Sequence, residues 1–202
     1  PILINRSQTT GSSTWTGQQL INEIAAIRTG LVRSGVQRGD RVVGYLPNIP
    51  QTVAAYIATV SLGAIWCSVP PEMGPKSVLD RIEQLEPSLM IAVDGYVWGS
   101  KRVERADEIA RIREALPNMQ LVLLPYLDAD VATPSGALSY VDFTAERDTL
   151  AFEAVPFEHP LVVLFSSGTT GKPKAIVHCH GGLLIEHFKA IALHFDISDA
   201  DR

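Results

Sequence analysis

One stretch decides the organisation of the chain, and it reads Leu161-Val-Val-Leu-Phe165-Ser166-Ser-Gly168-Thr-Thr-Gly171-Lys-Pro-Lys174-Ala-Ile-Val-His178. Its first five residues are apolar and predict a short, fully buried strand. Glycines, hydroxyls and lysines follow at once, and a second apolar run then resumes. Glycines let backbone N–H groups approach a bound polyanion, hydroxyls donate hydrogen bonds, and a lysine supplies positive charge. We therefore predict a loop that binds the phosphate groups of a nucleotide.

Upstream of this loop, strand patterns and helix patterns alternate with short connections. Short apolar runs predict strands at 41–46, 64–69, 89–93 and 121–124. Apolar residues at helical spacing predict helices at about 17–34, 50–62, 76–85 and 103–116, and a further helix at 181–194 follows the loop. Thr16 and Gln19 form a capping box before the first helix, and Gly35 is a stop signal after it. The order predicts an α/β fold with layered, largely parallel sheets flanked by helices.

The segment 127–158 departs from this alternation. It contains Pro134 and Pro156, many acidic residues and only weak periodicity. We interpret it as a long surface excursion with a short helix around Phe143–Arg147. The chain then divides into an α/β subdomain at 14–126, the excursion at 127–160, and the loop strands with the following helix at 161–202. No element is predicted for the first thirteen residues.

Composition places the chain among ordinary globular proteins. Hydrophobic residues make up 46% and charged residues 19%, with a net charge of −5 and a pI near 5.5. Such a balance gives no electrostatic basis for binding nucleic acid or an anionic membrane. The two cysteines, Cys67 and Cys179, are too few for a disulfide framework, which favours a reducing cytoplasm. The sequence carries no indication of the oligomeric state.

The uncharged stretch Val42–Pro71 is long enough on paper to cross a bilayer. Four prolines and several polar side chains interrupt it, however. We therefore predict a buried strand, helix and strand here, and no membrane span.

The loop does not match two common nucleotide-binding motifs. A P-loop needs a glycine five positions before Gly171, where the chain has Ser166, and a hydroxyl after Lys172, where it has Pro173. A dinucleotide-binding loop needs G-x-G-x-x-G after a strand, and the chain has no such motif. The phosphate loop therefore belongs to another class.

The nine residues Ser166-Ser-Gly-Thr-Thr-Gly-Lys-Pro-Lys174 resemble the phosphate loop of the adenylate-forming, AMP-binding synthetases, which include acyl-CoA synthetases, luciferases and peptide-synthetase adenylation domains. The stretch Gly35–Gln51 also resembles the family's G-V-x-x-G-D-R-V … L-P-N-x-P segment. The resemblance spans roughly Trp15–Arg202. Within the family, the chain is most similar to the short-chain CoA ligases that activate acetoacetate. Ala175, where most of the family has glycine, fits that subgroup.

The resemblance implies a two-step ligase reaction. A short-chain carboxylate, with acetoacetate favoured over acetate, attacks the α-phosphate of Mg-ATP, and CoA then displaces AMP from the acyl-adenylate. Positioning and charge stabilisation around the departing pyrophosphate do the catalytic work. By position, the family's contacts to the β- and γ-phosphates fall on Ser166, Ser167, Gly168, Thr169, Thr170, Gly171 and Lys174. Lys172 is expected to face solvent.

The resemblance also implies what the chain lacks. The family's adenine and ribose contacts, its magnesium-binding glutamate and the catalytic lysine of its small C-terminal domain come later in the sequence. We therefore interpret residues 1–202 as part of the large N-terminal domain of a longer ligase, without a catalytic residue and inactive alone. The alternative is a non-catalytic α/β module that binds a nucleotide or another phosphorylated ligand.

Two further groups of residues, the histidines near the loop and a pair of basic residues, each allow two interpretations. His178, His180 and His187 lie near the loop, and we favour packing and hydrogen bonding there over metal binding, so no metal site is predicted. Lys101 and Arg102 follow a strand end, where α/β folds bind ligands. The corresponding segment of related CoA ligases carries basic residues near the CoA phosphates, so the resemblance implies a CoA contact as one interpretation, but we favour a solvated turn over it. Cys67 and Trp66 are expected in the core.

Overall fold

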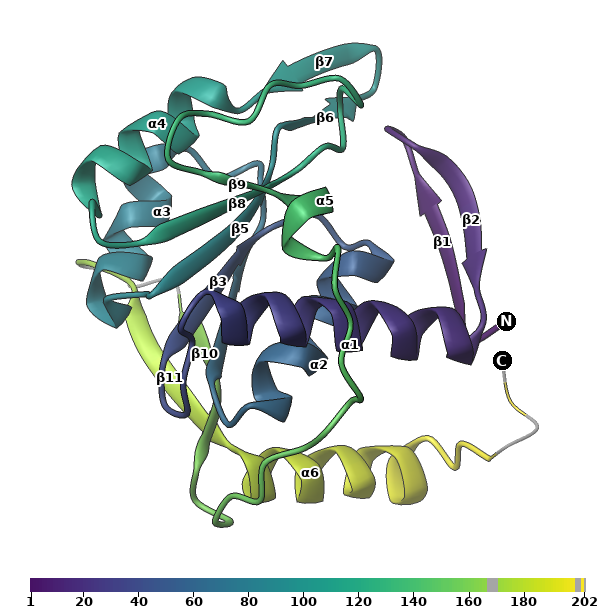
Figure 1. Cartoon of the computed structure of the whole chain (residues 1–202). Helices are drawn as coiled ribbons and strands as arrows, with labels where there is room; N and C mark the ends of the chain where they lie inside the picture. The colour runs from purple at the N-terminus through teal and green to yellow at the C-terminus, as the bar shows by residue number, and fades with distance from the viewer. Residues whose placement is uncertain (167–170, 199–200, 202) are drawn as a thin grey trace.

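The computed structural model describes residues 1–166, 171–198 and 201, and its centre is a seven-stranded sheet (Figure 1). The strand order is β11-β10-β4-β3-β5-β8-β9, and neighbouring strands run parallel except for the antiparallel pair β10–β11. The strands are β3 (Arg41–Tyr45), β4 (Ile65–Val69), β5 (Leu89–Val93), β8 (Gln120–Leu124), β9 (Leu138–Ser139), β10 (Pro160–Ser166) and β11 (Lys174–Cys179). The predicted fold class, α/β with a largely parallel sheet, is confirmed.

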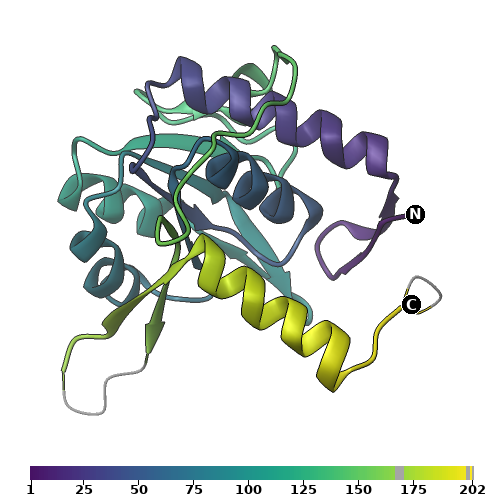
Figure 2. The same ribbon diagram turned by 90° about the horizontal axis from the view of Figure 1, so that it is seen from below.

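Two pairs of helices cover the two faces of the sheet (Figure 2). The first pair is α1 (Gly17–Arg33) and α2 (Pro50–Ser61), and the second is α3 (Pro75–Ile82) and α4 (Ala106–Ala115). Alternate residues of each strand point to opposite faces. Val42 therefore packs with the α1–α2 layer and Val43 with the α3–α4 layer. A sheet buried on both faces explains why its strands are continuously apolar.

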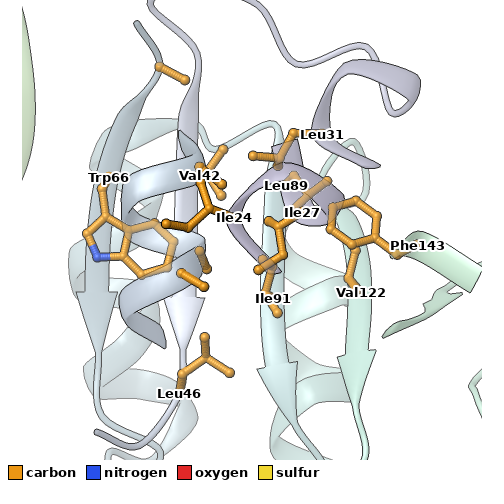
Figure 3. Packing of buried hydrophobic residues seen from close by; sticks show 14 of the residues in the cluster. Ile24, Ile27, Leu31, Val42, Leu46, Trp66, Leu89, Ile91, Val122 and Phe143 are labelled. Atoms are coloured by element: carbon orange, nitrogen blue, oxygen red, sulfur yellow. The ribbon is translucent and has the colours of Figure 1, made fainter. Parts of the chain in front are cut away.

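The α1–α2 layer holds the larger core cluster, part of which Figure 3 shows. Ile27 and Leu31 of α1 are fully buried, which stabilises the fold by roughly 1.5–3 kcal/mol for each side chain. Trp66 lies across Gly44, where a Cβ atom would come within 2.5 Å of the indole ring. Only glycine therefore admits the ring at this position.

Helix α1 begins and ends where the sequence predicts. The Thr16 hydroxyl accepts a hydrogen bond from the Gln19 backbone N–H at 3.2 Å, and the Gln19 side chain accepts one from the Thr16 N–H at 2.8 Å. Gly35 follows the helix with φ +80°, which a glycine adopts without strain.

Two small hairpins were not predicted. They are β1–β2 (Leu3–Ser7 and Gly11–Trp15) and β6–β7 (Gly95–Trp98 and Lys101–Glu104). Gln8 and Thr9, at the tip of the first hairpin, accept hydrogen bonds from the backbone N–H groups of Gly99 and Val97 in the second, at 3.1 and 2.9 Å. The helix predicted from Val103 is wrong in its first turn, because Val103 pairs with Tyr96 in the hairpin and α4 begins only at Ala106.

The segment after β8 is predicted to be a surface excursion, but Leu138–Ser139 within it forms β9, which pairs with β8 at the edge of the central sheet. Its short helix also lies earlier than expected. Helix α5 covers Tyr140–Phe143, and the Ser139 hydroxyl caps it by accepting a hydrogen bond from Asp142 N–H at 3.1 Å. Phe143 is buried against Gly30 of α1. The contact with α1 therefore decides where this helix forms.

The last elements extend away from the centre of the molecule (Figure 1). Helix α6 covers His180–Lys189 and continues into a single π-helical turn, η2, at Ala190–His194.

The uncharged stretch Val42–Pro71 forms β3, α2 and β4 in the predicted order. Among the described residues, no helix combines the length and apolar character that a membrane crossing needs.

Candidate functional site

The predicted phosphate loop connects β10 to β11, and its two ends are fixed by strand pairing. Ser166 and Lys174 are cross-strand partners, and Phe165 and Ala175 form the next pair. The strands therefore bring together the first and last residues of the predicted phosphate-binding set. Ser167, Gly168, Thr169 and Thr170 lie outside the described residues.

The described members of this set are accessible. Ser166 is half-buried, and Gly171 and Lys174 are exposed. Among the described residues, a Cβ atom on Gly171 would meet no heavy atom within 4 Å, so packing against them does not require glycine at this position.

The prediction of a fully buried strand at Leu161–Phe165 is wrong in its second half. Leu161, Val162 and Val163 are buried, but Leu164 is 48% exposed and Phe165 is half-buried. The cause is the strand pairing: among the described residues, β10 pairs with β4 at Val162 alone, whereas it pairs with β11 from Pro160 to Ser166. The two strands β10 and β11 extend out beyond the helix layers (Figure 2).

Two residues that sequence reasoning missed support the end of the loop. The Gln84 amide donates a hydrogen bond to the Pro173 carbonyl at 3.0 Å. Glu83 Oε2 lies 3.8 Å from the Lys172 Nζ, and these side chains are 43% and 66% exposed, respectively. Both belong to η1 (Glu83–Leu85), a 3₁₀ turn after α3. The Lys172 side chain is exposed, as expected, and its partner in η1 lies too far along the chain for local spacing to signal it.

The histidines near the loop occupy different surroundings. His180 begins α6, and its ring lies 5.7 Å from that of His159, whose Nε2 is 2.7 Å from the Gly63 carbonyl oxygen. His180 Nε2 is buried and, among the described residues, has no hydrogen-bond partner. Desolvation, and then the neighbouring His159, lower the pKa of His180. The described part of the chain contains no group of three or more His, Cys, Asp or Glu side chains suited to a metal ion.

Lys101 and Arg102 lie next to each other on β7 and so point to opposite sides of the hairpin. Lys101 is exposed and pairs across the two-residue turn with Trp98, which is 66% exposed. The Arg102 guanidinium donates a hydrogen bond to the Leu127 carbonyl at 3.2 Å. Arg102 also lines a pocket of about 270 Å³ between β7, α4 and the chain after β8. Both residues lie on β7, which Figure 1 shows near the top of the view, away from β10 and β11.

Asp94 anchors the strand ends beside this hairpin. Its buried carboxylate accepts hydrogen bonds from the backbone N–H groups of Tyr126, Leu127 and Asp128 at 2.7–2.8 Å. Asp94 therefore holds the chain as it leaves β8 and has a structural role.

Cys67 and Trp66 lie in the core, as predicted. Burial raises the pKa of the Cys67 thiol to about 12, which keeps it protonated at neutral pH and removes it as a nucleophile.

Comparison with known proteins gives one consistent result. The model of the family described as "AMP-binding enzyme" matches residues 2–202. The chain is 39% identical to acetoacetyl-CoA synthetase of Rattus norvegicus over 196 residues, covering 92% of this chain and 29% of that protein. It is 38% identical to acetoacetyl-coenzyme A synthetase of Rhizobium meliloti (strain 1021), covering 99% of this chain and 31% of that protein.

Similarity extends to a solved structure. Acetoacetyl-CoA synthetase from Streptomyces lividans matches with a TM-score of 0.94 and 43% identity, over 100% of this chain and 31% of that one. The chain therefore spans about three-tenths of the length of these relatives.

Proposed function

The chain belongs to the AMP-binding enzyme family, and from that premise we propose that it forms the phosphate-loop part of an acetoacetate–CoA ligase. The complete reaction would activate acetoacetate with ATP, release pyrophosphate and form a thioester with CoA. The relatives named as acetoacetyl-CoA synthetases support this choice of acid over other short-chain acids. The observation that carries the proposal is the pairing of Ser166 with Lys174, which closes the loop into a hairpin.

In this proposal the loop grips the β- and γ-phosphates of ATP. Backbone N–H groups and hydroxyls of Ser166, Ser167, Gly168, Thr169, Thr170 and Gly171 would donate hydrogen bonds. Lys174 would supply the positive charge, because it is exposed and opposite Ser166. A charge-assisted hydrogen bond to a phosphate is about twice as strong as a neutral one. Mg²⁺ would enter as part of the substrate complex with ATP.

We extend the proposal to CoA, with Lys101 and Arg102 at its phosphate groups. Lys101 offers an exposed ammonium group beside the exposed Trp98 ring. The Arg102 guanidinium already donates a hydrogen bond to the Leu127 carbonyl, so Lys101 would make the stronger contact with CoA.

We also propose that the 202-residue chain has no ligase activity by itself, in keeping with the three-tenths of the relatives that it spans. Acetoacetate-dependent exchange of pyrophosphate into ATP by this chain would contradict this part of the proposal. The non-catalytic module remains the alternative, and it would be favoured if a longer polypeptide containing this chain bound ATP without turnover.

The two lysines of the loop give a matched test. Calorimetric titration of the chain with Mg-ATP should show binding that Lys174→Ala weakens about tenfold, the loss of one charge-assisted contact. Lys172→Ala should change the affinity less than about twofold, because this exposed side chain pairs weakly with Glu83. Equal affinities for the two variants would remove Lys174 from the site.

A further inference from the structure

A buried arginine joins the ends of separate strands away from the predicted phosphate loop. Arg105 lies between β7 and α4 and is 8% exposed. Its Nε donates a hydrogen bond to the Pro71 carbonyl at 2.7 Å, and its Nη2 donates one to the Tyr96 hydroxyl at 2.9 Å. Its Nη1 pairs with Glu108 at 2.7 Å. A guanidinium with three directed partners acts as a rigid fork, which an ammonium group cannot reproduce.

Tyr45, the last residue of β3, also contacts the turn at 70–74, to which Arg105 binds through the Pro71 carbonyl. Its hydroxyl lies 3.0 Å from the Pro71 carbonyl oxygen and 2.5 Å from that of Met73. The side chain is fully buried, and burial raises the pKa of Tyr45 to about 12 although the Arg105 charge opposes the rise. Tyr45 therefore stays a neutral donor, and the turn at 70–74 is held from two directions.

These contacts lie at the point where the order of strand addition in the sheet reverses. From β3, the chain adds β4 on one side and then returns to add β5 on the other. Ligands of parallel sheets bind outside the carboxyl ends of the strands at such a point. Pro71 follows β4, Tyr45 ends β3, and Tyr96 follows β5, so the Arg105 bonds span this point.

The hairpin β6–β7 needs such support to hold a fixed position. Each of its strands has four residues, and a two-stranded hairpin is at best marginally stable by itself. Gln8 and Thr9 hold it near the turn. Arg105 and Tyr96 hold it at its base, which leaves the exposed Lys101 on a hairpin fixed at both ends.

We propose that Arg105 is a positioning residue, which fixes the β6–β7 hairpin relative to the turn at 70–74 and thereby places Lys101 for its ligand. This inference rests on the proposed contact between Lys101 and CoA. Arg105 itself does not touch the ligand. It acts by limiting the positions that Lys101 can take, so that less conformational entropy is lost on binding.

Hydrogen exchange of the 202-residue chain tests the bracing without any ligand. Arg105→Lys keeps the positive charge but loses the three directed hydrogen-bond donors of the guanidinium. The matched control is Arg113→Lys, in the last turn of α4, where the Arg113 guanidinium donates to the Ser135 carbonyl. Backbone amides in 95–104 and 72–74 should exchange about tenfold faster in Arg105→Lys and at the wild-type rate in the control. Tyr96→Phe, which removes one acceptor only, should give a smaller change of the same sign. Unchanged exchange in both Arg105→Lys and Tyr96→Phe would overturn the bracing.

Titration with CoA then tests the link to Lys101. Lys101→Ala should weaken CoA binding in the wild-type background and change it less than about twofold when Arg105→Lys is present, because coupled residues are not additive. An equal loss in both backgrounds would overturn the positioning role. If the wild-type chain binds no CoA, the ligand contact of Lys101 and the positioning role built on it are wrong, and the exchange data still decide the bracing.

Discussion

The centre of the sheet and the β10–β11–α6 region are both apolar in sequence, but only the first is covered. Every residue of β5 (Leu89–Val93) is fully buried. On α6 and η2, by contrast, Leu184, Phe188 and Leu193 are 71%, 72% and 77% exposed. Figure 2 shows the reason, since helices enclose the central strands while α6 stands at the border of the molecule.

The difference shows that an apolar pattern reports what a segment can bury and does not report what covers it. β5 has β3 and β8 as neighbours and helices on both faces. Within the described residues, β11 pairs with β10 alone, and Ile176 and Val177 are 45% and 58% exposed. Exposed apolar surface of this extent is typical of an interaction surface. We therefore expect the centre to supply most of the stability of this chain, whereas the second region exposes apolar surface.

The largest expected effect compares leucines on two helices. Leu31→Ala removes a fully buried side chain of α1 and should lower the free energy of unfolding by about 3 kcal/mol. Leu184→Ala removes an exposed side chain of α6 and should change it by less than about 0.5 kcal/mol. Urea unfolding measures both values. Similar losses in the two variants would contradict the division into a covered and an uncovered region.

A smaller difference in the free energy of unfolding is expected between variants of two carboxylates, Asp94 in the centre and Glu186 on α6. Asp94→Asn places an amide group against three backbone N–H donors and should cost about 2 kcal/mol, because a buried donor loses its acceptor. Glu186→Gln breaks a surface pair with Lys189 and should leave the free energy of unfolding nearly unchanged, because exposed ion pairs contribute little. The same urea experiment tests this pair. A loss at Glu186 as large as that at Asp94 would show that α6 contributes to the stable core.

Much of the central fold could be predicted because local patterns and burial agree there. The continuous apolar runs of β3 and β5 indicate strands buried on both faces, and Thr16 with Gln19 marks the start of α1. The β6–β7 hairpin could not be predicted, since the pairing of Val103 with Tyr96 overrides a helical apolar spacing. The place of α5 likewise depends on the contact of Phe143 with Gly30.

The candidate site stays a prediction, and the signal that indicates it is local. The order of hydroxyls and glycines marks the loop, and strand pairing brings Ser166 opposite Lys174. The contact of Gln84 with Pro173 and the bonds of Arg105 join residues distant in sequence. No spacing rule reports such contacts, because they depend on the strand order of the sheet.

The exposed face of α6 offers a third test. We expect the 202-residue chain to self-associate at high concentration through this face, and the double change Leu184→Ser with Phe188→Ser to weaken association about tenfold. Val141→Ser is the control, because Val141 is 70% exposed but lies on α5. Sedimentation velocity measures the effect. Association that responds to the control as strongly as to the double change would place the contact elsewhere.

The smallest effect concerns His180, which lies where the two regions meet. Its backbone N–H donates to the His159 carbonyl at 3.0 Å, and His159 in turn reaches Gly63 at the end of α2. Desolvation, and then His159, lower the pKa of His180. The unfolded chain therefore binds a proton more readily than the folded one, and stability should fall as the pH drops below the ordinary histidine pKa of about 6.5.

His180→Gln removes this titration, so its stability should fall less than that of the wild type between about pH 7 and pH 5. Leu184→Ala, at an exposed position of α6, changes no titrating group and should leave the wild-type pH dependence unchanged. Urea midpoints at the two pH values give the comparison. If His180→Gln keeps the full acid sensitivity, protonation at this junction does not weaken the attachment of α6, and the acid sensitivity belongs to the central region.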